Sequence, residues 1–157
     1  MAEEAPPDAV EATPTGTFIF PDGARYEGEW KAKDPVEGEE PKEPVEGEEP
    51  ARNFLRHGTG KCTVGNGGAW SYSGEWANDA MDGKGVFSYA SGAVYDGQWA
   101  ANKYEGAGTY VWPNGTKYIG QWVQSAMHGQ GTYTDKDGRQ WTGAFYNNTG
   151  PGLAMIV

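Results

Sequence analysis

Residues 85–99 read GVFSYASGAVYDGQW, and five stretches of the chain share this order of residues. A glycine opens each stretch, and in three of them aromatic residues follow two and four positions later. In four of the five copies, the tyrosine position, the next glycine and the tryptophan position then stand ten, twelve and fourteen places after the opening glycine, whereas two extra residues in the second copy move all three by two. The opening glycines are Gly16, Gly60, Gly85, Gly108 and Gly131. From Tyr72 onward the copies lie 23 residues apart, and self-similarity of this kind predicts a repeat array.

The spacing within each copy predicts two β-strands. All the aromatic and glycine positions named above differ by even numbers, which places their side chains on one face of an extended chain. Turn-forming residues separate the two runs, as in Pro21-Asp22-Gly23 and Pro113-Asn114-Gly115. Each copy is therefore predicted to be a β-hairpin. The predicted fold class is all-β: an elongated single-layer antiparallel meander of five hairpins plus a final C-terminal strand.

The register inside a hairpin follows from centring the turn on its glycine. This counting pairs Trp112 with Tyr118 and Tyr110 with Gly120, so the Tyr110 ring is predicted to cover Gly120. A slip by two residues is the alternative register.

The charge distribution divides the chain into a tail, an insert and a repeat domain. Residues 1–50 carry 15 acidic and 4 basic side chains, whereas the remaining residues carry 7 and 8. We expect an acidic, proline-rich tail over residues 1–15 and the repeat domain over 16–157. An acidic Pro/Glu/Gly insert over 32–53 separates the first two hairpins. This insert is predicted to be a solvated loop, or alternatively an acidic arm for a basic partner.

Several functional classes are disfavoured by the sequence. No apolar leader or membrane-spanning run is present, and Cys62 is the only cysteine, so we expect a reducing, cytoplasmic location. We expect Cys62 to be a buried packing thiol, and His57 and His128 to occupy a turn-capping position with no metal bound. No catalytic constellation and no basic footprint are evident, so we expect no enzyme, no cofactor and no nucleic-acid binding.

The motif ending in Tyr-x-Gly-x-Trp resembles the MORN repeat (membrane occupation and recognition nexus). Matching segments are RYEGEW ending at Trp30, SYSGEW ending at Trp76, VYDGQW ending at Trp99 and KYIGQW ending at Trp122. The fifth copy departs from the pattern, with Trp141 and Phe145 in the tyrosine and tryptophan positions. The resemblance implies a protein-interaction scaffold, similar to small repeat proteins of ciliary axonemes and radial spokes.

The aromatic positions are the candidate partner-binding residues. A one-layer sheet buries one face incompletely, so we expect part of this ladder of rings to contact a partner helix or peptide. The candidates are Tyr26, Trp30, Tyr72, Trp76, Tyr95, Trp99, Tyr118, Trp122, Trp141, Phe145, Tyr89 and Trp112. Stacking of the same rings into a core is the alternative.

A second candidate contact is the apolar C-terminal strand. Its residues Leu153, Met155 and Val157 would stand at the edge of the sheet, where unpaired backbone groups invite another chain or a second copy. We therefore expect other proteins as partners, with self-association through the sheet ends as an alternative. A peripheral membrane or phosphoinositide-binding adaptor is the alternative function, although the sequence offers no strong basic cluster to attract anionic lipid.

Overall fold

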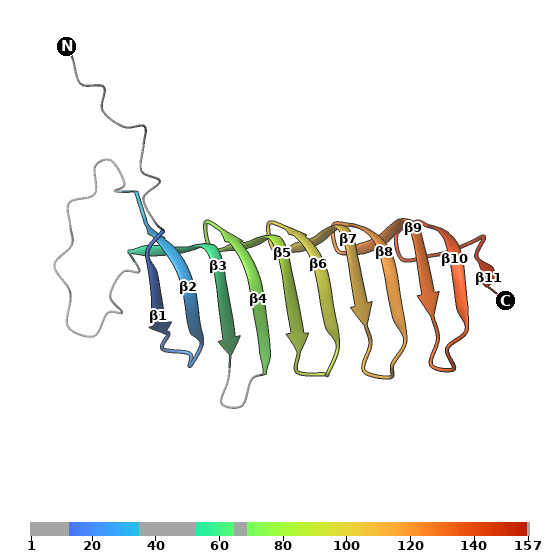
Figure 1. The fold of residues 1–157 in the computed structure, drawn as a ribbon, viewed down its shortest axis with the longest axis horizontal. Coiled ribbons are helices and arrows are strands. Elements are labelled where there is room, and N and C mark those ends of the chain that lie inside the picture. Colours follow the sequence, from blue (N-terminus) through green and yellow to red (C-terminus); the bar gives the residue numbers. More distant parts are fainter. Residues whose placement is uncertain (1–12, 35–52, 65–68, 157) are drawn as a thin grey trace, which may run out of the picture.

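The computed structural model describes residues 13–34, 53–64 and 69–156. The acidic tail apart from its last residues, most of the insert and Val157 lie outside the described residues. The described strands are β1 (Thr15–Ile19), β2 (Arg25–Ala32), β3 (Phe54–Val64), β4 (Trp70–Ala77), β5 (Ala80–Tyr89), β6 (Val94–Ala100), β7 (Lys103–Val111), β8 (Lys117–Val123), β9 (Ala126–Thr134), β10 (Gln140–Phe145) and β11 (Ala154–Ile156). Each strand pairs with its neighbours in chain order, which gives one open antiparallel sheet. The predicted all-β meander of five hairpins and a final strand is confirmed (Figure 1).

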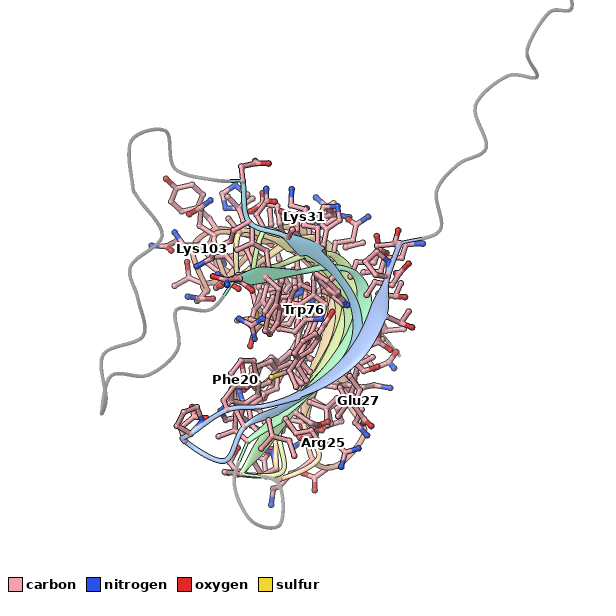
Figure 2. The ribbon with its side chains drawn as sticks, turned by 90° about the vertical axis from the view of Figure 1, so that its left-hand side faces the viewer. Phe20, Arg25, Glu27, Lys31, Trp76 and Lys103 are labelled. Atoms are coloured by element: carbon pink, nitrogen blue, oxygen red, sulfur yellow. The ribbon has the colours of Figure 1, made fainter. Side chains whose placement is uncertain are left out.

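Each strand bends along its length, so that the concave face of the sheet forms a trough that runs along the array (Figure 2). Figure 2 looks along this trough: Phe20 and Trp76 point into it, whereas Arg25 and Glu27 project from the convex side. Alternation along each strand places the aromatic residues inside and the charged residues outside. The core is therefore the trough itself, and a single layer of backbone encloses it.

The predicted register within the hairpins is wrong by two residues. Tyr110 pairs with Tyr118, and Gly108 pairs with Gly120. The reason is the turn, which begins one residue earlier than predicted: the Gly115 N–H donates to the Trp112 carbonyl, so glycine takes the last turn position and not its centre. Consequently, Tyr110 does not cover Gly120.

The connections between successive hairpins are two-residue turns in which both residues have positive φ. These pairs are Asn78-Asp79, Ala101-Asn102, Gln124-Ser125 and Asn147-Asn148. Positive φ at both central residues is the type I′ geometry, whose twist suits antiparallel strands. These turns were not predicted, because only some of these residue types favour positive φ.

A ladder of hydrogen bonds ties each two-residue turn to the preceding hairpin. The Asn102 N–H donates to the Met81 carbonyl at 3.0 Å, while the Asn102 side-chain oxygen accepts from the Met81 N–H at 2.8 Å. The same two-bond pattern joins Asp79 to Arg56, Ser125 to Tyr104 and Asn148 to Met127. Asp79, Asn102, Ser125 and Asn148 recur every 23 residues, so they form a further column of the repeat.

The first expected result concerns the turn at Ala101, where φ is 46° and a Cβ is unfavourable. Ala101→Gly should raise the free energy of unfolding by about 0.5–1 kcal/mol, because glycine reaches this conformation without the steric cost. Urea denaturation monitored by tryptophan fluorescence measures the change. As a control, Ala144→Gly, within strand β10, should destabilise the protein. Equal effects of the two substitutions would contradict a steric cost at Ala101.

Candidate functional site

The tyrosine and tryptophan columns form the floor of the trough. Tyr26, Tyr72, Tyr95 and Tyr118 are each 0% exposed, and Trp76, Trp99 and Trp122 are 4–5% exposed. Phe145 is also buried. This burial confirms the alternative prediction, in which these rings stack into a core, and it shows that they are not presented to a partner in this conformation.

The packing between these rings is a repeated edge-to-face arrangement. Tyr95 contacts Trp99 of its own hairpin, with ring centroids 5.1 Å apart, and Trp122 of the next hairpin, with centroids 5.5 Å apart. The interplanar angles are 88° and 87°, which bring ring edges against ring faces. Each tyrosine thus joins two successive hairpins, and the array is held together through its core.

The position of the tyrosine hydroxyl explains the glycines around it. Between hairpins the ladder is interrupted by bulges, such as the one between Gly97 and Trp99 opposite β7. The hydroxyl of Tyr95 donates to the Gln98 carbonyl at 2.8 Å, which satisfies a backbone group at this irregularity. The ring crosses Gly97 and Gly108, where any side chain would overlap it.

The bulge also has a side-chain cap on the convex side. The Gln98 side-chain oxygen accepts from the Ala107 N–H at 3.0 Å, and Glu75 does the same for Lys84 N–H at 3.0 Å. In the first hairpin, the Thr59 backbone N–H and hydroxyl donate to Glu29 and hold the pKa of its carboxyl below the ordinary value. In these three hairpins, the side chain before the tryptophan is therefore held by a hydrogen bond to the backbone of the next strand.

The indole N–H groups are likewise used inside the protein. Trp76, Trp99 and Trp122 donate to the carbonyls of Gly60, Gly85 and Gly108 at 3.2, 3.0 and 3.1 Å. Buried indoles normally find such a partner. These tryptophans are therefore satisfied both in packing and in hydrogen bonding.

A second expected result follows from the hydroxyl contact. Tyr95→Phe should lower the free energy of unfolding by about 1–2 kcal/mol, because the Gln98 carbonyl at the bulge loses its donor while the packing is kept. Thermal and urea denaturation measure the loss. Tyr146→Phe is the matched control, since Tyr146 is 69% exposed, and it should leave stability unchanged. Equal stabilities of the two variants would contradict the role of the hydroxyl.

The accessible aromatic surface lies nearer the rims of the trough. Of the predicted partner-binding residues, Trp30, Trp141, Tyr89 and Trp112 are only half-buried. Phe20 and Trp70, which the prediction did not include, are half-buried as well. The hydroxyls of Tyr89 and Tyr104 contact each other, so the trough is bridged at the third and fourth hairpins.

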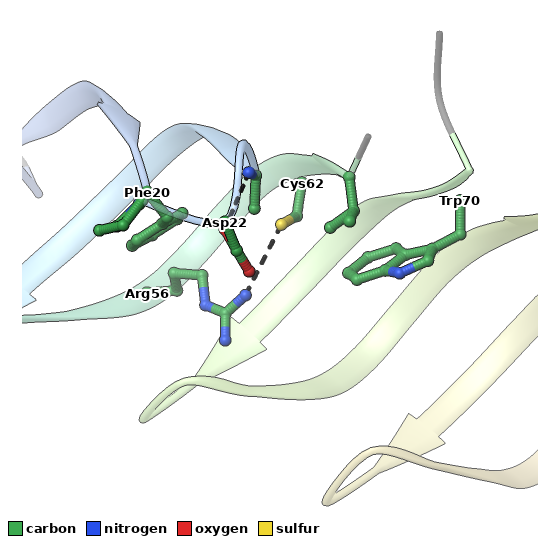
Figure 3. A pocket seen from close by; sticks show the side chains of 8 residues that line it. Phe20, Asp22, Arg56, Cys62 and Trp70 are labelled. Atoms are coloured by element: carbon green, nitrogen blue, oxygen red, sulfur yellow. Dashed lines mark hydrogen bonds between the residues drawn. The ribbon is translucent and has the colours of Figure 1, made fainter. Parts of the chain in front are cut away.

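A pocket of about 380 Å³ opens in the trough between the first two hairpins (Figure 3). Its lining residues are Phe20, Pro21, Asp22, Ala24, Arg56, Cys62, Val64 and Trp70. The Arg56 guanidinium lies 4.2 Å from the centre of the Trp76 ring and donates to the Asp79 carboxylate at 3.2 Å. Arg56 thus lies in the trough, whereas the nearby basic residue Lys61 is exposed.

The remaining sequence predictions are placed as follows. Cys62 is 1% exposed, which confirms a buried packing thiol. The predicted turn-capping column is confirmed for its acidic members, since Asp82 accepts from the Ala101 N–H and Glu105 from the Gln124 N–H. His57 shares the column, yet its buried Nδ1 makes no hydrogen bond. The described residues contain no group of three or more potential metal ligands.

The C-terminal strand β11 pairs with β10 and forms one edge of the described sheet. Met155 and Ile156 are 54% and 50% exposed, whereas Leu153 precedes the strand and packs against the core cluster. Leu153 is therefore better described as a core residue than as the predicted edge contact, and Val157 lies outside the described residues. Within the described ranges, no helix is long and apolar enough to cross a membrane.

Comparison with known families is consistent with this geometry. A family model described as MORN repeat matches residues 55–69, 72–94, 95–117 and 118–138, which together make up just over half of the chain. A search of curated proteins gave no match. The hairpin β1–β2 lies outside the matched segments, although its Tyr26 occupies the same buried position as the later tyrosines.

Proposed function

The chain belongs to the MORN repeat family, and from this we propose that it is a non-enzymatic scaffold that binds another protein along its trough. Membership of the family supports a role of the repeats in protein interaction or in membrane association. The finer proposal is that a helix or an extended peptide of the partner lies along the rims, against the half-buried rings. The trough is a preformed surface, which limits the ordering cost on binding.

The observation that carries the proposal is the line of incompletely buried aromatic side chains at the trough rim. Tyr89 and Trp112 occupy the same column in successive hairpins: Tyr89 is the last residue of β5, and Trp112 directly follows β7. Large rings that are half-buried and held on a regular sheet are the side chains that most often anchor protein interfaces. The buried tyrosine row below them supplies a firm support.

Membrane binding is the alternative, and the described charges favour it less. Arg25, Arg56 and Arg139 each form an ion pair with a carboxylate of the chain. Attraction to anionic lipid needs clustered basic side chains, each worth roughly 1 kcal/mol near the surface. A place in a cytoskeletal or ciliary assembly is the further part of the proposal, and it is supported only by the resemblance between repeat scaffolds.

The test is affinity purification with mass spectrometry, using the full chain and the double variant Tyr89→Ala/Trp112→Ala. We expect the double variant to lose the proteins that the unmodified chain retains, while its far-ultraviolet circular dichroism is unchanged. Ile119→Ala is the matched control, because Ile119 is 48% exposed and its neighbour Tyr118 faces the core. Retention of the same proteins by the folded double variant would refute the proposal. Sedimentation with phosphoinositide vesicles at physiological salt would instead support the membrane alternative.

A further inference from the structure

The second hairpin departs from the repeat at three positions that line one pocket. Where the third hairpin has Phe87 and Tyr89, the second has Cys62 and Val64. The column that contains Met81, Tyr104 and Met127 has Arg56 in the second hairpin. These smaller and charged side chains leave the space of about 380 Å³ described above. Local departures that coincide in space are typical of functional positions in an otherwise regular array.

We propose that this pocket holds one large apolar side chain of a partner peptide, with a neutral peptide carbonyl accepting a hydrogen bond from Arg56. This inference rests on the proposed scaffold function and assigns the anchor point within it. The volume lies in the range of ligand sites and accommodates a ring with its adjoining backbone. Phe20, Val64 and Trp70 supply apolar walls for the side chain.

The polar end of the pocket favours an acceptor on the partner. The Nη1 group of Arg56 donates to the Cys62 sulfur at 3.7 Å, and a thiol is a weak acceptor. The Nε and Nη2 groups of Arg56 donate to Asp79, to its carboxylate and to its carbonyl at 3.1 Å respectively. A peptide carbonyl would be a stronger acceptor for Nη1 than the thiol is.

The charge balance favours a neutral group over a carboxylate. Among the described residues that line the pocket, Arg56 is the one basic residue and Asp22 the one acidic residue, and Asp79 pairs with Arg56. A further carboxylate would add negative charge to a site where two acidic groups already oppose one guanidinium. An uncharged stretch of partner chain is therefore the expected occupant.

The trough farther along the array offers less room for such an anchor. At the third and fourth hairpins, Tyr89 and Tyr104 meet through their hydroxyls, and Tyr104 stacks on Tyr95 with centroids 3.8 Å apart. Rings occupy there the positions that Val64 and Arg56 hold in the second hairpin. The rings of Tyr89 and Tyr104 therefore leave less room for an anchor there than Val64 and Arg56 leave at the second hairpin.

The first arm of the test uses N-acetyl-L-phenylalaninamide as probe, followed by ¹H–¹⁵N NMR on the full chain. We expect millimolar probe to shift the Trp70 indole and Arg56 Nε resonances, and N-acetyl-L-alaninamide to leave them unchanged. N-acetyl-L-phenylalanine, which adds a carboxylate, should bind several-fold more weakly. Tighter binding of that acid, or shifts that map elsewhere, would overturn the inference.

The second arm fills the pocket with the residues of the third hairpin. Cys62→Phe/Val64→Tyr should weaken probe binding at least tenfold. Arg56→Met should also weaken it, and this smaller change serves as the test if the double variant does not fold. Thr63→Tyr, on the same strand between the two pocket residues, is the matched control and should bind normally. Equal probe binding by the folded filled variant would refute the site.

The third arm separates the pocket from the scaffold function. We expect the filled variant to lose the partner that depends on Tyr89 and Trp112. If it loses the probe but retains that partner, the pocket is not the anchor, although the scaffold proposal stands. A probe affinity that rises when residues 35–52 are deleted would mean that this segment of the same chain occupies the pocket. A probe affinity that falls as copies of the chain associate would mean that a second copy occupies it. Either result would also overturn the inference.

Discussion

Gly97→Ala is expected to destabilise the protein by about 3 kcal/mol or more, which is enough to unfold a marginally stable domain. A Cβ at Gly97 would lie 2.7 Å from the Ala107 carbonyl oxygen and 2.7 Å from the Tyr95 hydroxyl, and it would also contact the Gly108 backbone. Neither backbone atom can move without opening the pairing of β6 with β7. The ring of Tyr95 is fixed on the other side by Trp99 and Trp122.

Two other glycines provide graded controls for this result. Gly115 has a φ of 86° but open space around its Cα, so Gly115→Ala should cost only about 1 kcal/mol for the backbone conformation. Gly152 has neither constraint, so Gly152→Ala should be nearly neutral. Urea denaturation of the three variants measures the order. A Gly97 variant as stable as the Gly152 variant would show that the strands separate easily at this position.

Alkaline unfolding is the second large effect that we expect. Burial raises the pKa of Tyr26 to about 12, against the lowering influence of Arg56, and it raises the pKa of Tyr72, Tyr95 and Tyr118 above the ordinary value of 10.0. The folded protein therefore retains phenolic protons that the unfolded chain releases. Stability is complete below pH 10 and declines as the pH rises toward 12, because the unfolded state binds fewer protons.

The expected slope is steep because several rings act together. Each tyrosine that is ionised only in the unfolded state lowers the free energy of unfolding by about 1.4 kcal/mol per pH unit. Four such rings give roughly 5.6 kcal/mol per pH unit, so phenolate absorbance and the loss of circular dichroism should rise together. Tyr95→Phe should reduce the slope. Gradual ionisation with an intact spectrum would contradict this expectation.

The fold was predictable because its signals are local and repeated. Even spacing and turn residues specify hairpins, and their recurrence specifies the array. The register was not predictable to the residue, because it depends on which turn position Gly115 takes. The two-residue turns were missed because Ala101 and Gln124 are uncommon at positive φ, although the 23-residue recurrence of Asp79 and Asn102 carries the signal.

The candidate site was predictable only in part. The sequence shows which rings share a face, but their burial depends on the curvature of the sheet, which is a property of many strands together. Tyr95 is therefore core, while Trp112 in the same trough is half-buried. The pocket was not predicted, because the two extra residues of the second copy offset Arg56 from Met81 and Tyr104 in the 23-residue repeat. Only after these positions are aligned does the sequence show an arginine where the later hairpins have methionine or tyrosine.

Each two-residue turn is hydrogen-bonded to the hairpin that precedes it in the chain, and this limits where the chain can vary in length. Every such turn from Asp79 onward is bonded to the hairpin before it, so lengthening one of them would remove both bonds. The acidic insert lies instead in the connection from β2 to β3, so it interrupts none of these four bonded turns.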